Sequence, residues 1–168
     1  KATVLTMYLL PNTVNMLKDK LLAELSPGTR ILSHDYPLAG WIPEKYVQMD
    51  LEDKVIISGV TTTLIYLYVV PARAEGSWSA KLPASLSKDA VRLTLRQQIT
   101  RVSGSARIGG REVLLEEGKL RGERLTFKLA LNGKMWDFTG TVKGSAIEGS
   151  VADTGGGTKA AWSAAAAR

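Results

Sequence analysis

The sequence predicts two successive units, an α/β unit with a parallel sheet and an antiparallel β unit that forms a small meander barrel or sandwich. An apolar run near the start passes directly into a helical pattern, and a second apolar run follows within about thirty residues. After residue 72 the pattern changes to short alternating strands punctuated by glycine. We therefore assign residues 1–72 to the α/β unit and residues 73–168 to the β unit.

The first apolar run, ATVLTMYLL, has the composition of a strand that is covered on both faces of a parallel sheet. Pro11 ends this strand, and Asn12 or Thr13 can cap the helix that follows. Apolar residues at three- and four-residue steps predict that helix, which ends at Ser26-Pro27-Gly28. Its apolar positions are Val14, Leu17, Leu21, Leu22 and Leu25.

A second buried strand is predicted over residues 29–33, which completes one right-handed crossover unit. Residues 35–44 form a loop with two prolines and a tryptophan. Two further strands, roughly residues 46–58 and 61–70, are predicted to pair antiparallel because only a few residues around Gly59-Val60 separate them.

The β unit alternates apolar and polar residues with a period of two over residues 91–100, 125–131 and 136–151. This pattern is typical of strands with one buried and one solvated face. A glycine followed by a polar residue suits a type II′ hairpin turn, so we expect an up-and-down meander. The predicted turns are Gly104-Ser105, Gly122-Glu123 and Gly144-Ser145.

Composition excludes several kinds of site. The chain has no cysteine and one histidine, His34, which excludes disulfides, thiolate chemistry and metal sites built from cysteine or several histidines. No apolar run is long enough to predict a membrane-spanning helix. No signal-peptide pattern is visible, and the compartment stays open between the cytoplasm and the cell envelope.

The positive charge lies in the second unit. Residues 1–72 contain 6 basic and 7 acidic side chains, and residues 73–168 contain 16 and 9. A basic unit can bind nucleic acid, anionic lipid or an acidic protein, although a solvated surface is the commoner explanation. Nucleic-acid binding is disfavoured because aromatic residues do not alternate with the arginines.

Two segments follow the carboxyl ends of the predicted parallel strands, which is where ligands bind in such sheets. They are Tyr8-Leu9-Leu10-Pro11-Asn12 and His34-Asp35-Tyr36. A histidine beside a carboxylate suits acid–base chemistry, and the alternatives are a plain strand-to-helix turn and a capped loop with a partly buried imidazole. Trp41 is either a lid that stacks on a ligand or, as its composition favours, a hydrophobic plug.

The run VLTMYLLPNTVNMLKDKLLAELSPGTRILSHDYPLAGWIP resembles the carboxyl-terminal half of a class I S-adenosylmethionine-dependent methyltransferase. It is especially similar to a bacterial group with YLLP, PGTR, SHD and a Gly-x-Trp-x-Pro-like loop in this order. The later IYLYVVPAR and GSW resemble the same proteins, whose β-rich extension ends in Trp-x-Ala-x-Arg. Trp162, Ala164 and Arg168 match that ending at a longer spacing.

The resemblance implies a partial Rossmann-like methyltransferase sheet that begins at its fourth strand. The glycine-rich turn and the acidic residue that build most of the family's donor site are not found in this sequence. We therefore expect an incomplete fragment without its amino-terminal part, inactive or poorly active alone. We also expect its first strand to present an open edge that favours self-association.

The same resemblance implies roles for the candidate residues. His34, Asp35 and Tyr8 would serve catalysis, and Trp41 and Tyr36 would face the acceptor. A related eukaryotic group of membrane-associated protein lysine methyltransferases makes a protein lysine one possible acceptor. The competing hypothesis is a non-catalytic binding module whose basic β unit recognises an anionic partner or surface. The residues implied to line the S-adenosylmethionine cleft are Tyr8, Leu9, Pro11 and Asn12.

Overall fold

The computed structural model describes residues 2–157 and 159–167. The chain divides into two compact units, unit 1 (Lys1–Pro71) and unit 2 (Ala72–Arg168), and each is described separately. In the described part of the chain, no helix has the length and apolar character that crossing a membrane requires.

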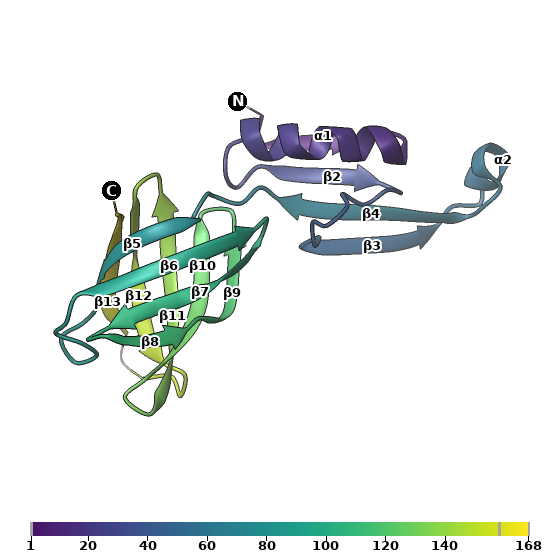
Figure 1. The fold of residues 1–168 in the computed structure, drawn as a ribbon. Helices are drawn as coiled ribbons and strands as arrows, with labels where there is room; N and C mark the ends of the chain where they lie inside the picture. Colours follow the sequence, from purple (N-terminus) through teal and green to yellow (C-terminus); the bar gives the residue numbers. More distant parts are fainter. Residues whose placement is uncertain (1, 158, 168) are drawn as a thin grey trace. The chain divides into compact units, whose positions relative to one another are not determined.

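Unit 1 contains a small mixed sheet (Figure 1). Its strands are β1 (Val4–Met7), β2 (Arg30–His34), β3 (Lys45–Asp50) and β4 (Thr62–Val69). They lie in the order β1-β2-β4-β3. β1 and β2 run parallel and are connected by α1 (Pro11–Glu24), as predicted. β4 pairs antiparallel with β2 and β3, which confirms the predicted antiparallel pair.

Helix α1 lies along one face of this sheet (Figure 1). Val14 and Leu21 from its predicted apolar stripe are buried. Ile31 of β2 and Tyr68 of β4 are register partners and are both fully buried. The hydrophobic core of unit 1 therefore lies between α1 and this face.

The prediction of a first strand covered on both faces is wrong. β1 spans four residues, and Tyr8 and Leu10 beyond it are 76% and 70% exposed. β1 lies at the edge of the sheet, so the apolar composition of this run does not reflect burial within the described structure.

Two local predictions in unit 1 also need correction. The N-cap of α1 is Leu10, whose side chain makes no capping hydrogen bond. Pro11 occupies the first helical position, and its nitrogen carries no hydrogen that a cap would have to satisfy. Asn12 and Thr13 thus lie inside the helix. The predicted strand over residues 46–58 ends at Asp50, and helix α2 (Lys54–Ser58) follows it and ends at Gly59.

Unit 2 is a closed antiparallel barrel, so the alternative of a sandwich is wrong. In the described part of this unit, eight strands pair in a ring, which the β13–β5 and β6–β7 pairings close. The short strand β8 pairs with residues 105–108 of β7, on the same edge at which β9 pairs with Arg101. The strands are β5 (Gly76–Lys81), β6 (Val91–Gln98), β7 (Arg101–Ile108), β8 (Arg111–Leu114), β9 (Glu116–Arg121), β10 (Arg124–Leu131), β11 (Lys134–Lys143), β12 (Ala146–Asp153) and β13 (Ala160–Ala166).

Two of the three predicted turns are present. Gly122-Glu123 and Gly144-Ser145 connect strands, and the glycine of each has φ +58°. The Gly104-Ser105 prediction is wrong, because both residues lie inside β7 and the turn before β7 is Ile99-Thr100. Gly104 has φ +147°, and a Cβ there would lie 1.9 Å from the carbonyl oxygen of Thr94. Glycine is required here by the close approach of β6 and β7.

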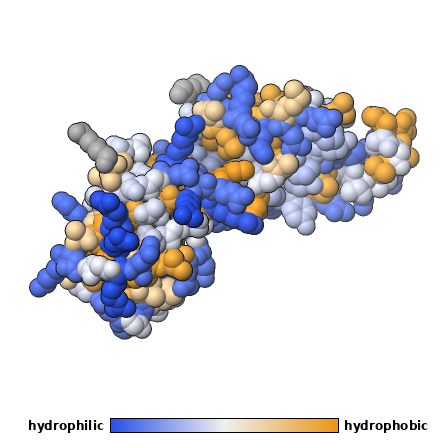
Figure 2. All heavy atoms as spheres, in the orientation of Figure 1, coloured by the Kyte–Doolittle hydropathy of each residue, from blue (hydrophilic) through white to orange (hydrophobic). Residues whose placement is uncertain are grey.

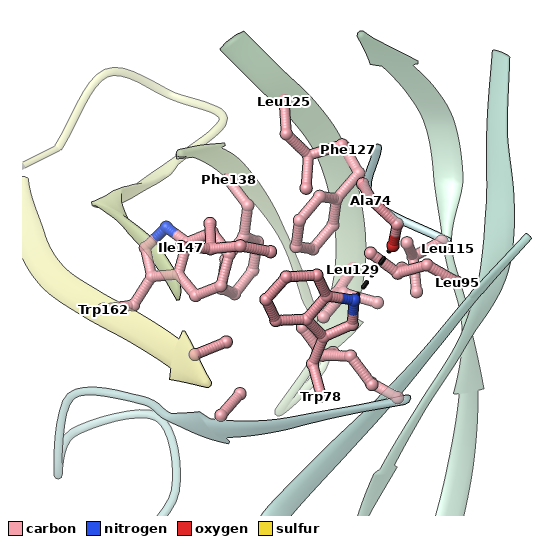
Figure 3. Packing of buried hydrophobic residues seen from close by; sticks show 14 of the residues in the cluster. Ala74, Trp78, Leu95, Leu115, Leu125, Phe127, Leu129, Phe138, Ile147 and Trp162 are labelled. Carbon is pink, nitrogen blue, oxygen red and sulfur yellow. Dashed lines mark hydrogen bonds between the residues drawn. The ribbon is translucent and has the colours of Figure 1, made fainter. Parts of the chain in front are cut away.

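Large aromatic side chains fill the interior of the barrel (Figure 3). The rings of Phe127 and Phe138 stack with centroids 4.9 Å apart, and Trp162 packs edge-on against both. The indole N–H of Trp78 donates to the carbonyl of Ala74 at 2.9 Å. Trp162 and Ala164, two matches to the Trp-x-Ala-x-Arg ending, are thus core residues, and the third, Arg168, lies outside the described residues.

Candidate functional site

A pocket of about 470 Å³ lies in unit 1 beyond the carboxyl ends of β1 and β2. This is the edge of the sheet at which parallel strands present their ligand-binding loops. The wall combines aromatic, aliphatic and charged side chains. Its residues are Tyr8, Leu9, Leu10, His34, Asp35, Tyr36, Leu51, Asp53, Lys54, Ile57, Ser58 and Thr63.

Asp35 is held in place by its backbone and by its side chain. Its φ is +60°, a left-handed conformation that aspartate tolerates better than most residues. Its amide N–H donates to the carbonyl of Leu64 at 2.7 Å, and the amide of Leu64 donates to Asp35 Oδ1 at 2.9 Å. These bonds fix the carboxylate at the end of β2, against the start of β4.

The second carboxylate oxygen of Asp35 faces two basic groups. Lys54 Nζ lies 2.5 Å from Oδ2 and His34 Nδ1 lies 3.5 Å from it. Partial burial raises the pKa of Asp35, but the hydrogen bonds from Lys54 and Leu64 and the charges of His34 and Lys54 outweigh burial, so its pKa is lowered. Asp35 is therefore an ionised carboxylate at neutral pH.

Tyr8 and His34 form the aromatic part of the pocket. Their ring centroids are 4.6 Å apart with an interplanar angle of 41°. Tyr8 comes from the loop after β1 and His34 ends β2, so the parallel pairing of these strands brings the rings together. The imidazole thus lies between the tyrosine ring and the Asp35 carboxylate.

Thr63 contributes a polar atom without a partner. Its side chain is buried at 2% exposure on β4, and its Oγ1 makes no hydrogen bond among the described residues. A buried hydroxyl without a partner is costly, and in a pocket wall it marks a place where a polar ligand atom can bind.

The structure places five predicted residues on the pocket wall, namely Tyr8, Leu9, His34, Asp35 and Tyr36. Three other predicted residues lie elsewhere in unit 1. Pro11 and Asn12 are exposed in the first turn of α1. Trp41 is 2% exposed and packs with its ring centroid 5.3 Å from that of Tyr68, as expected of a hydrophobic plug.

Lys54 and Thr63 are site residues that the sequence analysis missed. Both lie in segments predicted as plain strands. The available signal was the charged stretch Glu52-Asp53-Lys54, which interrupts the apolar pattern and coincides with the start of α2. No group of three or more metal-ligating side chains occurs among the residues that the structure describes.

Comparisons with known proteins connect this chain with methyltransferases. No protein-family model matches it. Over 70 residues, 42% of the chain, it is 41% identical to a protein-lysine N-methyltransferase from Saccharolobus islandicus (strain REY15A), of which it covers 39%. A solved RNA methyltransferase from Salinibacter ruber, in complex with S-adenosyl-L-homocysteine, is 36% identical with a TM-score of 0.33, over 43% of this chain and 40% of that one. The chain thus spans about two fifths of the length of these proteins. Over the 70 matched residues it is similar to a protein-lysine N-methyltransferase.

Proposed function

We propose that unit 1 carries the acceptor side of a methyltransferase that transfers the methyl group of S-adenosylmethionine to a protein lysine. The observation that carries this proposal is the 41% identity over 70 residues with a protein-lysine N-methyltransferase. The pocket at the carboxyl edge of β1 and β2 supports it, because His34, Asp35 and Tyr8 meet there.

S-adenosylmethionine supplies an electrophilic methyl group when bound. The pocket rim formed by Tyr8, Leu9 and Leu10 is apolar and exposed, which suits contact with the donor, and we propose Tyr8 and Leu9 as the residues that touch it. We leave Pro11 and Asn12 out of this set because neither lines the pocket.

The remaining work of the site is to orient an amine and to remove its proton. Methyl transfer requires the nitrogen lone pair in line with the methyl carbon, so a protonated lysine must first lose a proton. In our proposal His34 accepts that proton, Asp35 stabilises the resulting imidazolium, and Tyr8 positions the acceptor by stacking and hydrogen bonding.

We further propose that unit 1 is part of a larger methyltransferase domain. Among the residues that the structure describes, 15 of the 16 exposed large hydrophobic side chains lie in unit 1, and the other, Leu114, lies in unit 2. Figure 2 shows apolar side chains on the surface where α2 lies. Monomeric domains rarely expose so much apolar surface, so a covering segment or partner is the simplest explanation.

Enzyme assays test the proposed residues. In the whole enzyme, His34→Ala and Tyr8→Phe should each lower kcat/KM for a lysine acceptor more than fivefold, whereas Tyr46→Phe on β3, outside the pocket, should not. Unchanged kinetics in both pocket variants would contradict the assignment. Calorimetry of S-adenosylmethionine with this chain should show weak binding, and submicromolar affinity would contradict the proposal that the main donor loop lies elsewhere.

A second candidate function concerns unit 2. A groove of about 1100 Å³ is lined by the basic residues Lys81, Lys88, Arg92 and Arg107 and by one carboxylate, Asp89. Arg92 and Arg107 are register partners on β6 and β7, where like charges repel unless an anion lies between them. We propose this groove as the binding site for an anionic partner.

Retention on a heparin column tests this second function. Arg92→Glu combined with Arg107→Glu should elute at clearly lower salt than Lys143→Glu combined with Lys134→Glu, which makes the same change of charge outside the groove. Equal elution of the two double variants would show that only the net charge matters.

A further inference from the structure

The pocket already holds an ammonium group, that of Lys54. Its Nζ lies 2.5 Å from Asp35 Oδ2 and also donates to the carbonyl oxygen of Thr62. The Lys54 side chain is only 13% exposed, so the ammonium is largely withdrawn from water. A carboxylate and a carbonyl oxygen are the acceptors that compensate such an ion.

The surroundings of Lys54 suit a cation at the end of an aliphatic chain. Asp53 adds a second carboxylate to the wall, and Tyr8 and Tyr36 add aromatic rings. An ammonium donates three hydrogen bonds, and the unpartnered Oγ1 of Thr63 offers an acceptor beyond Asp35 and Thr62.

Little apolar packing holds Lys54 in this position. Helix α2 has five residues, none of them buried, and Ile56 and Ile57 are 87% and 83% exposed. The connection between β3 and β4 that contains α2 is therefore fastened mainly by polar contacts, in which the Lys54 ammonium takes part. A competing ammonium can replace Lys54 without disrupting a hydrophobic core.

We propose that Asp35, Thr62 and Thr63 form a binding site for a primary ammonium group on an aliphatic chain, and that Lys54 occupies it as an internal pseudosubstrate. This inference rests on the proposed function, since it identifies the site of the acceptor lysine. Lys54 then limits access, because a substrate lysine must displace it from Asp35. Because its Nζ is already paired with Asp35 and the Thr62 carbonyl, Lys54 acts as a competitor for this site.

Binding of n-butylammonium to this chain tests the inference without a methyl donor. We expect Lys54→Met to bind it at least tenfold more tightly than the unchanged chain, as followed by NMR shifts of the Asp35 and Leu64 amides. Lys20→Met, which removes an exposed lysine of α1, should bind like the unchanged chain. n-Butanol, the neutral counterpart, should produce no saturable shifts, and adding Asp35→Asn to Lys54→Met should abolish binding. Equal affinity of the Lys54→Met and unchanged chains, or no binding to folded Lys54→Met, would overturn the proposal.

A second measurement uses the unchanged chain and does not depend on how Lys54→Met folds. Excess n-butylammonium should accelerate acetylation of Lys54 by acetylimidazole, which releases imidazole and leaves a secondary amide, at least threefold relative to that of Lys20, as quantified by mass spectrometry. An unchanged ratio would overturn the displacement. Neither experiment measures methyl transfer, so failure of amine binding can be distinguished from failure of the enzymatic function. A whole enzyme that binds n-butylammonium but transfers no methyl group would contradict only the proposed enzymatic function.

Discussion

Asp35 and Leu64, 29 residues apart in sequence, are joined by two hydrogen bonds, from the Asp35 amide to the Leu64 carbonyl and from the Leu64 amide to the Asp35 carboxylate. Lys54 engages the other carboxylate oxygen. One side chain thus connects the end of β2, the start of β4 and the α2 segment. The carboxylate contributes to the order of the pocket as well as to its charge.

The free energy of unfolding of unit 1 should decrease as the pH is lowered below about 4. The pKa of the Asp35 carboxyl is lower in the folded state than in the unfolded state. The unfolded state therefore binds the proton more tightly. The stabilisation by this carboxylate is complete above its ordinary pKa, and it is lost as the pH falls through its folded-state pKa. Urea unfolding at pH 6 and pH 3, followed by unit 1 amide signals, measures this difference. Asp35→Asn should lower stability at pH 6 by about 1–2 kcal/mol and flatten the pH dependence. If the stability of Asp35→Asn depends on pH as steeply as that of the unchanged chain, other carboxylates are responsible for the pH dependence.

Tyr68→Phe should destabilise unit 1 by about 1–3 kcal/mol, because it removes the hydroxyl oxygen that accepts a hydrogen bond from the Leu38 amide at 3.0 Å. Tyr68 is fully buried, so water cannot replace the lost acceptor without rearrangement. Tyr46→Phe is the matched control, since Tyr46 is 60% exposed. Denaturant unfolding measures both variants, and equal stabilities would show that the buried bond contributes nothing.

Gly104→Ala should destabilise the barrel by about 3 kcal/mol, at the upper end for an overpacked site. The added Cβ would lie 1.9 Å from a β6 carbonyl oxygen, so the β6–β7 pairing would have to separate. Gly155→Ala, in the turn after β12, is the control, since its Cβ would come no closer than 3.4 Å to Asp153. Thermal unfolding followed by tryptophan fluorescence compares the two, and an equal effect would contradict the close-approach argument.

The isolated chain should self-associate through unit 1. Its sheet has edges at β1 and β3, and every residue of β3 is exposed. Val47→Lys on β3 should weaken association in sedimentation velocity runs over a hundredfold concentration range. Leu114→Lys in unit 2 adds the same charge at a 71% exposed position and should leave association unchanged. A monomer at all concentrations would contradict this prediction.

Periodicity predicted most of the secondary structure where one physical effect dominates. Alternating residues identified β6, β10, β11 and β12 of unit 2, because a closed barrel has one buried and one solvated face along each strand. The choice of barrel over sandwich depends on the pairing of β5 with β13, which local sequence does not encode. Gly104 was misassigned because a glycine that permits close strand contact has the same sequence signal as a turn glycine.

Only the part of the candidate site that follows β1 and β2 was predicted from the sequence. Tyr8, His34 and Asp35 follow from the rule that ligands bind beyond parallel strands, and all three line the pocket. Lys54 could not be predicted, because its contact with Asp35 spans 19 residues and depends on a short helix inside a segment with a strand-like composition. The first strand gave the opposite error. Its apolar composition predicted burial on both faces, and most of its residues are exposed or only partly buried in this structure.

The pairing of β5 with β13 also determines when unit 2 can finish folding. Lys81 of β5 and Ser163 of β13 are register partners. β5 is synthesised before the other strands of the ring, and it cannot form this pairing until β13 has been synthesised. Until the ribosome releases β13, the interior that holds Trp78 and Phe138 stays open along one side. A nascent chain therefore exposes both an unfinished barrel and the apolar surface of unit 1, which makes it a candidate client for chaperones during translation.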